Sequence, residues 1–470
     1  MRKISIVSIY LFVLFLCINA ILSCKKQKIN EEAALHFSTS EVFFDTVFTS
    51  IGSITRHFTV HNPTNREIST TIFLAGGKQS QYSINVDGAP GTYFKNITIP
   101  KKDSIFIFVK VNINPQNQNA PFFVKDSIVF LTGKHAQDVK LLAYGQDARY
   151  IVADKDKGYK VVAGEHQTVR WTKERPYVVY GWAAIDSLGT LEIEPGTKIY
   201  FHKNSGLWAY RFSKLKVNGT VNEPVLFRGD RLESWYNDDY AQWNRIWINE
   251  GAEVTIQNAI ITNAFIGLQI EALPYNNGTI TITPHIVKVE NTIIQNTKHC
   301  GVLSKFLNVE MTNCVISNNG ASSLQLEGGN YTLKHLTVGN YFTQAERKVP
   351  ACYVSNSISG YDNVLCETKA DFTNCIIYGN RGTEVEVNKK QEANLNASFQ
   401  NCLIKSAASG YFVDCMLNTD PKFTNVAKQD YRLLSESPAV GKGKNIGVDK
   451  DILGNLRTNP PDIGAYQFTR

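Results

Sequence analysis

The sequence predicts an all-β protein in which a β-sandwich precedes a right-handed parallel β-helix. Three observations carry this prediction. A short phrase, Asn followed by a small residue and then two apolar or β-branched ones, returns along the second half of the chain. Alternating apolar and polar runs fill much of the first third, and an apolar segment ending in Ile21-Leu22-Ser23-Cys24 precedes both. The chain therefore divides into a leader, a sandwich and a repetitive part.

The first 24 residues are predicted to be a secretion signal. Two basic residues precede an apolar run that ends at Cys17. This run is shorter than the roughly 20 residues of a membrane-spanning helix, which argues against an uncleaved helix. The end of the segment resembles the lipobox of bacterial lipoproteins, which implies that Cys24 carries a lipid. We expect a polar tether over residues 25–34 and an outer-membrane anchor that faces either the periplasm or the outside.

Residues 35–148 have the pattern of an immunoglobulin-like β-sandwich. Runs of alternating apolar and polar residues are separated by Asn-Pro, Gly-Gly and Pro-Gln-Asn turns. The runs are Arg56–Val60, Ser69–Leu74, Ser104–Asn112, Ser127–Leu131 and Val139–Ala143. Short strands at this spacing fit such a fold, although the Cys and Trp landmarks of antibody domains are absent from the segment. We expect it to be a spacer or an interaction domain rather than a catalytic one.

The repetitive part predicts a parallel β-helix. From Thr292 the small-residue position of the phrase steps at intervals of 22, 21 and 22 residues to Cys314, His335 and Ser357, and then reaches Cys402 after 45. Twenty-two residues extend to roughly 70 Å at about 3.3 Å each, which is enough for one circuit of a three-sided coil. Strands one circuit apart would pair at about 4.8 Å, so equivalent residues would stack in columns.

Two columns follow from this stacking. The small residues of the phrase are predicted to point into a narrow interior; they are Ala259, Thr292, Cys314, Ser357, Cys375 and Cys402. Asn263, Asn296 and Asn318 are predicted to form a ladder at a tight turn, because Asn tolerates left-handed backbone angles. Seven cysteines follow the leader, with no C-x-x-C pair, which favours buried thiols over a zinc site or a disulfide framework. A Cys375–Cys402 disulfide is the alternative.

Several phrases resemble right-handed parallel β-helix proteins of the pectate-lyase type, as found in Bacteroidetes lipoproteins. The likeness rests on residues 191–199, 215–220, 227–233, 430–433 and 461–466. Related β-helices include lyases, hydrolases and inert scaffolds, so the resemblance implies a fold and no single activity.

The domain boundaries follow from these patterns. We expect a connector and cap over residues 149–190, the coil over 191–419 and an end cap over 420–470. Caps are expected because an open end of a β-helix is an unpaired edge that would pair with another chain. Arg457 and Asp462 are predicted to form an ion pair that closes the last rung.

The best candidate for a ligand site in the sequence is an insertion rich in aromatic and charged residues. Its members are Arg228, Asp230, Arg231, Glu233, Trp235, Tyr236, Asp238, Asp239 and Trp243. Aromatic faces stack on sugar rings, and carboxylates and Arg can bind hydroxyls, uronates or Ca²⁺. The alternative interpretation is structural: the bulky residues fill and cap the first rungs, and the Arg residues pair with Asp230 and Glu233.

No standard catalytic or nucleotide-binding motif is present in the sequence, and no other cofactor than Ca²⁺ is indicated. The balance of 49 basic against 42 acidic residues is no signal for nucleic acid. We expect an envelope lipoprotein that binds or scaffolds extracellular carbohydrate through the β-helix without catalysis. A polysaccharide lyase or a glycoside hydrolase using Asp238 and Asp239 is the first alternative. A structural envelope protein or adhesin is the second.

Overall fold

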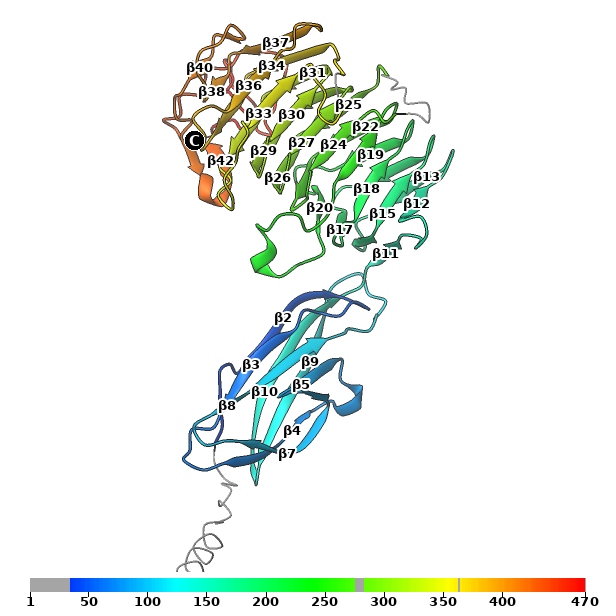
Figure 1. Cartoon of the computed structure of the whole chain (residues 1–470), viewed down its shortest axis with the longest axis vertical. Coiled ribbons are helices and arrows are strands. Elements are labelled where there is room, and N and C mark those ends of the chain that lie inside the picture. Colours follow the sequence, from blue (N-terminus) through cyan, green and yellow to red (C-terminus); the bar gives the residue numbers. More distant parts are fainter. Residues whose placement is uncertain (1–33, 275–282, 362–363, 470) are drawn as a thin grey trace, which may run out of the picture. The chain divides into compact units, whose positions relative to one another are not determined.

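The computed structural model describes residues 34–274, 283–361 and 364–469 (Figure 1). The chain divides after Asp147 into two compact units. The first is a β-sandwich and the second is a parallel β-helix, so the predicted fold class is confirmed. Cys24 and the rest of the leader lie outside the described residues. Within the described ranges, no helix has the length and apolar character needed to cross a membrane.

The N-terminal unit packs two sheets face to face. Sheet A has the strand order β1-β3-β8-β5-β6, and sheet B has the order β2-β10-β9-β4-β7. The strands are β1 (His36–Phe37), β2 (Glu41–Phe48), β3 (Arg56–His61), β4 (Ile68–Leu74), β5 (Tyr82–Val86), β6 (Ala89–Gly91), β7 (Tyr93–Ile99), β8 (Ser104–Val111), β9 (Phe122–Thr132) and β10 (His135–Gln146). The alternating runs predicted as strands are present as β3, β4, β8, β9 and β10. Their inward residues, such as Val60, Ile72 and Phe130, form the core between the sheets.

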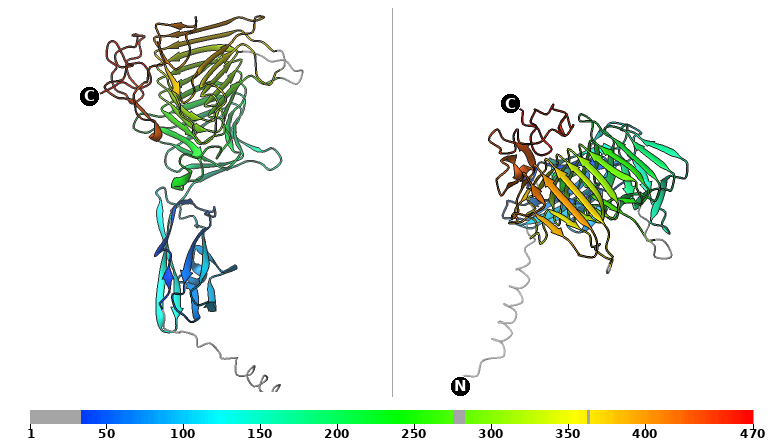
Figure 2. Two further views of the ribbon diagram at one scale, coloured as in Figure 1. Left: turned by 60° about the vertical axis from the view of Figure 1, so that its left-hand side comes forward. Right: turned by 90° about the horizontal axis from the view of Figure 1, so that it is seen from above.

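The C-terminal unit is a coil of three long parallel sheets, named D, E and F here (Figure 2). Sheet D contains β11 (Arg149–Val152), β14 (Tyr177–Tyr180), β17 (Lys198–Phe201), β20 (Val225–Gly229), β23 (Ala259–Thr262), β26 (Ile293–Thr297), β29 (Val315–Asn319), β32 (Thr337–Asn340), β35 (Ile376–Gly379), β38 (Leu403–Ile404) and β40 (Met416–Leu417). Sheet E contains β12 (Tyr159–Ala163), β15 (Trp182–Ile185), β18 (Gly206–Ala209), β21 (Ile246–Asn249), β24 (Leu268–Glu271), β27 (Val302–Lys305), β30 (Leu324–Glu327), β33 (Cys352–Ser355) and β36 (Val385–Asn388). Sheet F contains β13 (Thr168–Trp171), β16 (Thr190–Ile193), β19 (Lys214–Asn218), β22 (Glu253–Gln257), β25 (Ile286–Glu290), β28 (Asn308–Thr312), β31 (Gly329–Lys334), β34 (Thr368–Thr373), β37 (Leu395–Gln400) and β39 (Phe412–Val413).

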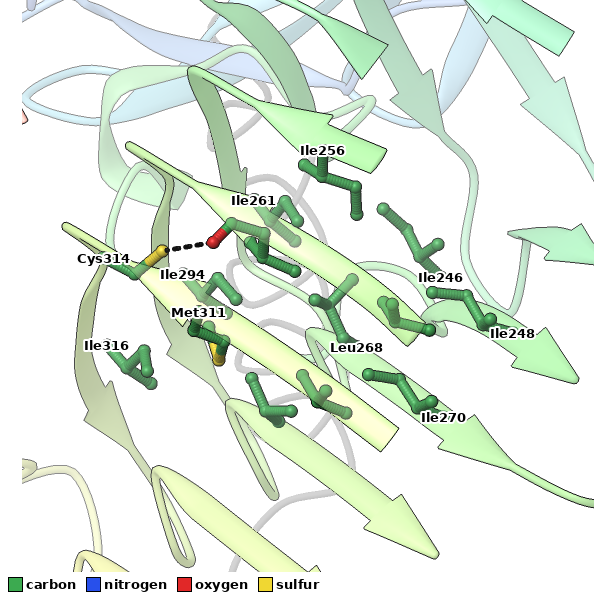
Figure 3. Packing of buried hydrophobic residues seen from close by; sticks show 14 of the residues in the cluster. Ile246, Ile248, Ile256, Ile261, Leu268, Ile270, Ile294, Met311, Cys314 and Ile316 are labelled. Atoms are coloured by element: carbon green, nitrogen blue, oxygen red, sulfur yellow. Dashed lines mark hydrogen bonds between the residues drawn. The ribbon is translucent and has the colours of Figure 1, made fainter. Parts of the chain in front are cut away.

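Aliphatic side chains fill the coil in stacked columns (Figure 3). Ile261, Ile294 and Ile316 lie in successive rungs of sheet D, paired in register, and none is exposed. Ile248 and Ile270 repeat the pattern in sheet E. All seven cysteines in the described part of the chain are free thiols; five are buried, and Cys366 and Cys415 are half-buried.

The coil begins earlier than the sequence patterns indicate. The strands β11, β12 and β13 already pair in parallel with β14, β15 and β16. Residues 149–190, expected to be a connector and cap, therefore form the first rungs. The Asn phrase is absent there because the corner from sheet F to sheet D takes five residues, 172–176, instead of the single Asn258 between β22 and β23.

A left-handed residue marks the corner between sheets F and D from β22 onward. These residues have φ between +48° and +56°; they are Asn258, Asn291, Asn313, His335, Asn374, Asn401 and Asp414. Short polar side chains tolerate this conformation by hydrogen bonding nearby groups. Neighbours in the column also contact each other: Asn313 Nδ2 donates to Asn291 Oδ1 at 3.2 Å. The second predicted Asn column is left-handed too, at Asn263, Asn296 and Asn318.

The phrase at Asn356-Ser357 does not occupy the corner between sheets F and D. It follows β33, at the turn from sheet E to sheet F, and His335 takes the corner position. The Asn356 side chain instead holds a turn of the next rung, since its Nδ2 donates to the carbonyls of Lys390 and Ala393 at 2.9 and 2.8 Å. Ser357 is accordingly only half-buried, while the other small residues of the phrase are buried as predicted.

The C-terminal segment covers the outer face of sheet D rather than the end of the coil (Figure 2). It contains β41 (Phe423–Asn425), β42 (Asp430–Leu433) and the short 3-10 helix η3 (Val426–Lys428). Its apolar side chains and outward residues of sheet D form one buried cluster of Val315, Ile376, Leu403, Phe423, Tyr431, Leu433, Ala439, Ile452, Ile463 and Ala465. The expected end cap is thus a cover for one face.

Arg457 and Asp462 do not form the predicted ion pair. The Arg457 guanidinium donates to Asn313 Oδ1 at 2.8 Å and to the carbonyl of Gly464 at 3.0 Å. The Asp462 carboxylate accepts hydrogen bonds from the backbone N–H groups of Gly441 and Phe468 at 2.7 and 2.6 Å. Backbone groups of an irregular segment need such partners, and each side chain satisfies several of them.

Candidate binding face on the β-helix

The three outer faces of the coil differ in chemistry. Sheet F presents ion pairs between neighbouring rungs, such as Lys216–Glu192 at 3.2 Å and Lys214–Glu253 at 2.9 Å. Sheet D is covered by the C-terminal segment. Sheet E presents aromatic side chains on its first rungs and amide, carboxylate and Lys side chains on later ones. Sheet E thus differs from both other faces, and its half-buried aromatic rungs make it the candidate for ligand binding.

The aromatic part of this face lies on β12, β15, β18 and β21. Trp208 and Trp247 stack in register, with ring centroids 5.0 Å apart and 16° between their planes. Trp182 approaches Trp247 at 5.8 Å. Tyr159 and Tyr210 meet Trp208 edge-on at 6.0 and 5.1 Å. A cleft of ≈ 220 Å³ lies among Trp208 and the two tyrosines.

The polar part continues the same columns on β24, β27, β30, β33 and β36. The register runs from Trp247 to Gln269, Leu303, Gln325, Tyr353 and Glu386. A parallel column runs through Asn249, Glu271, Lys305 and Glu327. We call the outward side chains of these two columns, with Tyr159, Trp182 and Trp208, the sheet E strip.

Glu271 is the centre of a hydrogen-bond network within the strip. Its Oε1 accepts from Trp247 Nε1 at 2.8 Å and from Gln269 Nε2 at 2.6 Å. The Arg245 guanidinium contacts Gln269 Oε1, and burial lowers the pKa of Arg245. Glu271 and Gln269 point outward yet are only 7% and 8% exposed. Neighbouring segments therefore lie along the strip and shield these side chains from solvent.

One wall is the turn between β33 and β34. Glu327 Oε2 accepts from both the backbone N–H and the hydroxyl of Ser359, at 2.8 and 2.7 Å, while Oε1 accepts from Gln325 Nε2 at 2.6 Å. Lys305 Nζ donates to the Ser359 carbonyl at 2.6 Å and lies 5.8 Å from the ring centroid of Tyr361. Charged groups of the strip thus hold this wall in place.

The opposite wall lies between sheets D and E. The rings of Phe265 and His299 stack at 6.0 Å, and Arg245 lies 5.8 Å from the Phe265 ring centroid. Burial, and then the charge of Arg245, lowers the pKa of His299. Cys300 Sγ lies 3.1 Å from His299 Nδ1, yet burial raises the pKa of the Cys300 thiol far above its usual range. The Cys–His contact is therefore not that of an activated nucleophile.

The insertion predicted as a site forms the turn from β20 to β21 and includes the 3-10 helix η2 (Ser234–Tyr236). Trp243, at its end, belongs to the interior: its ring stacks on Phe201 at 4.4 Å, and it is 1% exposed. Its Nε1 donates to the Thr262 carbonyl at 2.8 Å. The structural interpretation is correct for this residue.

The remaining residues of the insertion make contacts with the turn itself or with its neighbours. Asp230 contacts His202 at 2.7 Å, Arg231 lies 4.0 Å from Glu233 and 5.6 Å from the Tyr236 ring centroid, and Arg228 donates to the Arg231 carbonyl at 3.0 Å. Asp238 accepts from Gln429 Nε2 at 3.4 Å, whereas Asp239 accepts from the Tyr240 N–H at 3.1 Å. The two aspartates therefore serve separate contacts. Trp235 is 54% exposed.

Sequence reasoning missed the residues of the strip. Trp208 and Trp247 are visible in the sequence, but a four-residue strand does not reveal which side chains share a face until its register is known. Within the residues that the structure describes, no group of three or more His, Cys, Asp or Glu is placed to hold a metal ion. Ca²⁺ binding stays a prediction.

The comparisons with known proteins do not assign the chain to a family. No family model matches the chain. No curated protein matches it either. Among solved structures, the chain is similar to a family 123 glycoside hydrolase from Clostridium perfringens, described for glycolipid glycan hydrolysis, with 8% identity and a TM-score of 0.19 over 26% of this chain. The match spans 30% of that protein's chain, and a likeness of this size carries no argument about activity.

Proposed function

We propose that the protein is an envelope lipoprotein whose sheet E strip binds an extended carbohydrate chain. The observation that carries the proposal is the strip itself, in which stacked indole rings lead directly into carboxylate, amide and Lys side chains. Aromatic faces accept the apolar faces of sugar rings, and the polar groups suit their hydroxyls.

The dimensions of the strip favour a polymer over a small ligand. From β12 to β33 the sheet makes seven pairing steps, which at about 4.8 Å each amount to roughly 34 Å. The cleft beside Trp208 marks one end of this path, and Asp186 also lines it. Walls on both sides of the polar half would restrict a ligand to the direction of the coil axis.

Binding fits the strip better than catalysis does. Glu271 and Glu327 lie two steps apart, about 9.6 Å between Cα atoms, which is near the carboxyl separation of inverting glycosidases. That spacing makes a hydrolase the second candidate. However, both oxygens of Glu327 already accept hydrogen bonds from the protein, which suits an anchor for the wall rather than a free acid or base.

The test is retention of the chain from Lys25 onward on acidic and neutral polysaccharides, with reducing ends measured in parallel. We expect a Trp208→Ala, Trp247→Ala double variant to bind at least about tenfold more weakly. Trp235→Ala, an exposed indole outside the strip, is the matched control and should bind normally. Equal binding by the double variant would refute the proposal. Reducing ends that disappear in Glu271→Gln would establish the hydrolase instead.

The lipid anchor needs its own experiment. The full chain carrying Cys24→Ala should leave the membrane fraction if Cys24 is lipidated. Unchanged membrane retention would contradict the anchor and leave the binding proposal untouched.

A further inference from the structure

A second cleft lies in the N-terminal unit, on the outer face of sheet A, and we propose that it binds a sugar that carries a carboxylate. Its volume is ≈ 630 Å³, and β5, β6 and β8 form it. Its lining includes Ser83, Asn85, Pro90, Phe108 and Lys110. Nothing in this cleft depends on the sheet E strip, which belongs to the other unit.

Phe108 supplies an exposed aromatic surface in the cleft. Its strand neighbours Ile107 and Val109 are buried in the sandwich core, so Phe108 points outward, where 38% of it is exposed. On one side it faces Asn85 of β5, and on the other it faces His57 of β3, whose ring centroid lies 5.8 Å away. The Phe106 ring of the same strand stacks on Phe108, with centroids 6.2 Å apart. The Phe108 ring is therefore held by its neighbours while part of its surface stays accessible.

Three hydrogen-bond donors beside this ring are not used by the protein. Asn85 Oδ1 accepts from the Gly88 N–H at 2.8 Å, which fixes the amide. Across the described residues, Asn85 Nδ2, the Ser83 hydroxyl and Lys110 Nζ have no hydrogen-bond or ion-pair partner. Ser83 and Lys110 are directly opposite each other on β5 and β8, two residues along the strands from Asn85 and Phe108.

The charge of the cleft selects the ligand. Lys110 is the charged side chain among its lining residues, and no carboxylate lines it. A neutral sugar would use the ring and the amide but not Lys110, and a simple organic anion would not use the ring. A sugar ring with a carboxylate uses the aromatic face, the neutral donors and the ammonium group together.

Strand addition by a peptide is disfavoured at this place. The edge strand β6 has three residues, Ala89–Gly91, and its centre is Pro90, which lacks an N–H donor. Short edge strands that contain Pro block pairing with another strand. The ligand is thus expected to enter the cleft through side-chain contacts.

The experiment is calorimetric titration of the chain from Lys25 onward. Every variant is made in a background protein that carries Trp208→Ala and Trp247→Ala, so that the sheet E strip does not contribute to binding. The probes are a short oligogalacturonate and its fully methyl-esterified form. We expect Lys110→Gln to weaken binding of the oligogalacturonate about tenfold while leaving the ester unchanged. Phe108→Ala should weaken both. Phe123→Ala is the matched control, because Phe123 is an exposed ring of sheet B, 43% exposed, that does not line the cleft.

The outcomes separate this proposal from the first one. Because these side chains are exposed, thermal melting should be the same in all variants, which excludes unfolding as the cause of lost binding. Absence of oligogalacturonate binding in the strip-deficient background would overturn the proposal, as would a Phe108→Ala variant that binds normally. Equal losses in Phe123→Ala and Phe108→Ala would also overturn it. None of these results bears on polysaccharide binding by the intact strip.

Discussion

The outer faces of sheets D and E belong to the same coil and share its interior, yet their outward side chains have different surroundings. Sheet D turns Val315, Ile376 and Leu403 outward and buries them under the C-terminal segment. Sheet E turns Trp208 and Trp247 outward, where both rings are half-buried and stack on each other. The interior columns thus build the coil, whereas the outward columns decide what each face contacts.

The two faces also differ in the interactions that attach the neighbouring segments to them. The cover of sheet D is attached mainly through apolar burial, with Tyr431 at its centre. The segments beside sheet E are attached through charged groups, such as Glu327 and the buried Arg347–Glu384 pair, which joins the turns that precede β33 and β36. Mutations should therefore separate the two faces by their chemistry.

The largest effect is expected on the cover of sheet D. Tyr431 is 1% exposed and donates its hydroxyl to the Gly339 carbonyl at 2.9 Å. Tyr431→Ala should lower the free energy of unfolding by about 4 kcal/mol, measured by urea denaturation, because it leaves a large cavity. Leu456→Ala is the control; Leu456 is 73% exposed, and the change should stay within about 0.5 kcal/mol. A loss as small as the control's would show that the segment is not packed as described.

The next effect concerns the ion pair beside sheet E. Arg347 and Glu384 have side chains 1% and 0% exposed, and Glu384 Oε2 also accepts from the Ala351 N–H at 2.9 Å. Glu384→Gln should cost about 3 kcal/mol, because it leaves a buried guanidinium without its counter-charge. Urea denaturation measures the loss. If the Gln variant unfolds like the parent, the pair contributes specificity and not stability.

A pH effect is expected at the one His of the corner column. Burial, and then the charge of Arg457, lowers the pKa of His335 to about 3, so the folded protein keeps this ring neutral. The unfolded chain binds a proton below about pH 6.5, so this stability is present above that pH and is lost as pH falls towards 3. We expect a loss of about 2 kcal/mol between pH 7 and pH 5.

His335→Asn should remove this pH dependence. The residue has φ +52°, and Asn occupies most other positions of the column. Urea denaturation at pH 7 and pH 5 should therefore give more similar free energies for the variant than for the parent. An unchanged difference between the two pH values would assign the pH dependence to other groups.

The smallest effect is expected on sheet F. Glu192 lies between Arg170 and Lys216 at 3.1 and 3.2 Å, and the hydrogen bond from Lys216 lowers its pKa. Glu192→Gln should cost less than about 1 kcal/mol, because pairs on a solvated face gain little net energy. The difference from the parent should shrink further at high salt. A larger, salt-independent loss would mean that this face is not simply solvated.

The sequence predicts the fold well because short sequence patterns specify most of its strands and corners. Alternating runs mark the sandwich strands, and corner Asn residues mark rungs of the coil. The first rungs escaped detection because their longer corners, such as residues 172–176, lack that Asn. The sheet E strip escaped because Trp208, Trp247 and Glu271 come together only through strand register, over distances that no motif spans.

The fixed corner between sheets F and D makes the coil tolerant of change elsewhere. From β22 to β40 this corner takes one or two residues in every rung. Residues 230–245 and 341–351 form long turns between sheets D and E, and residues 356–361 and 364–367 lie between sheets E and F. New segments inserted at these places would leave the stacking of the coil in phase. The turns beside sheet E can therefore change in length and sequence, and with them the surface of the strip, while the rungs of the coil stay unchanged.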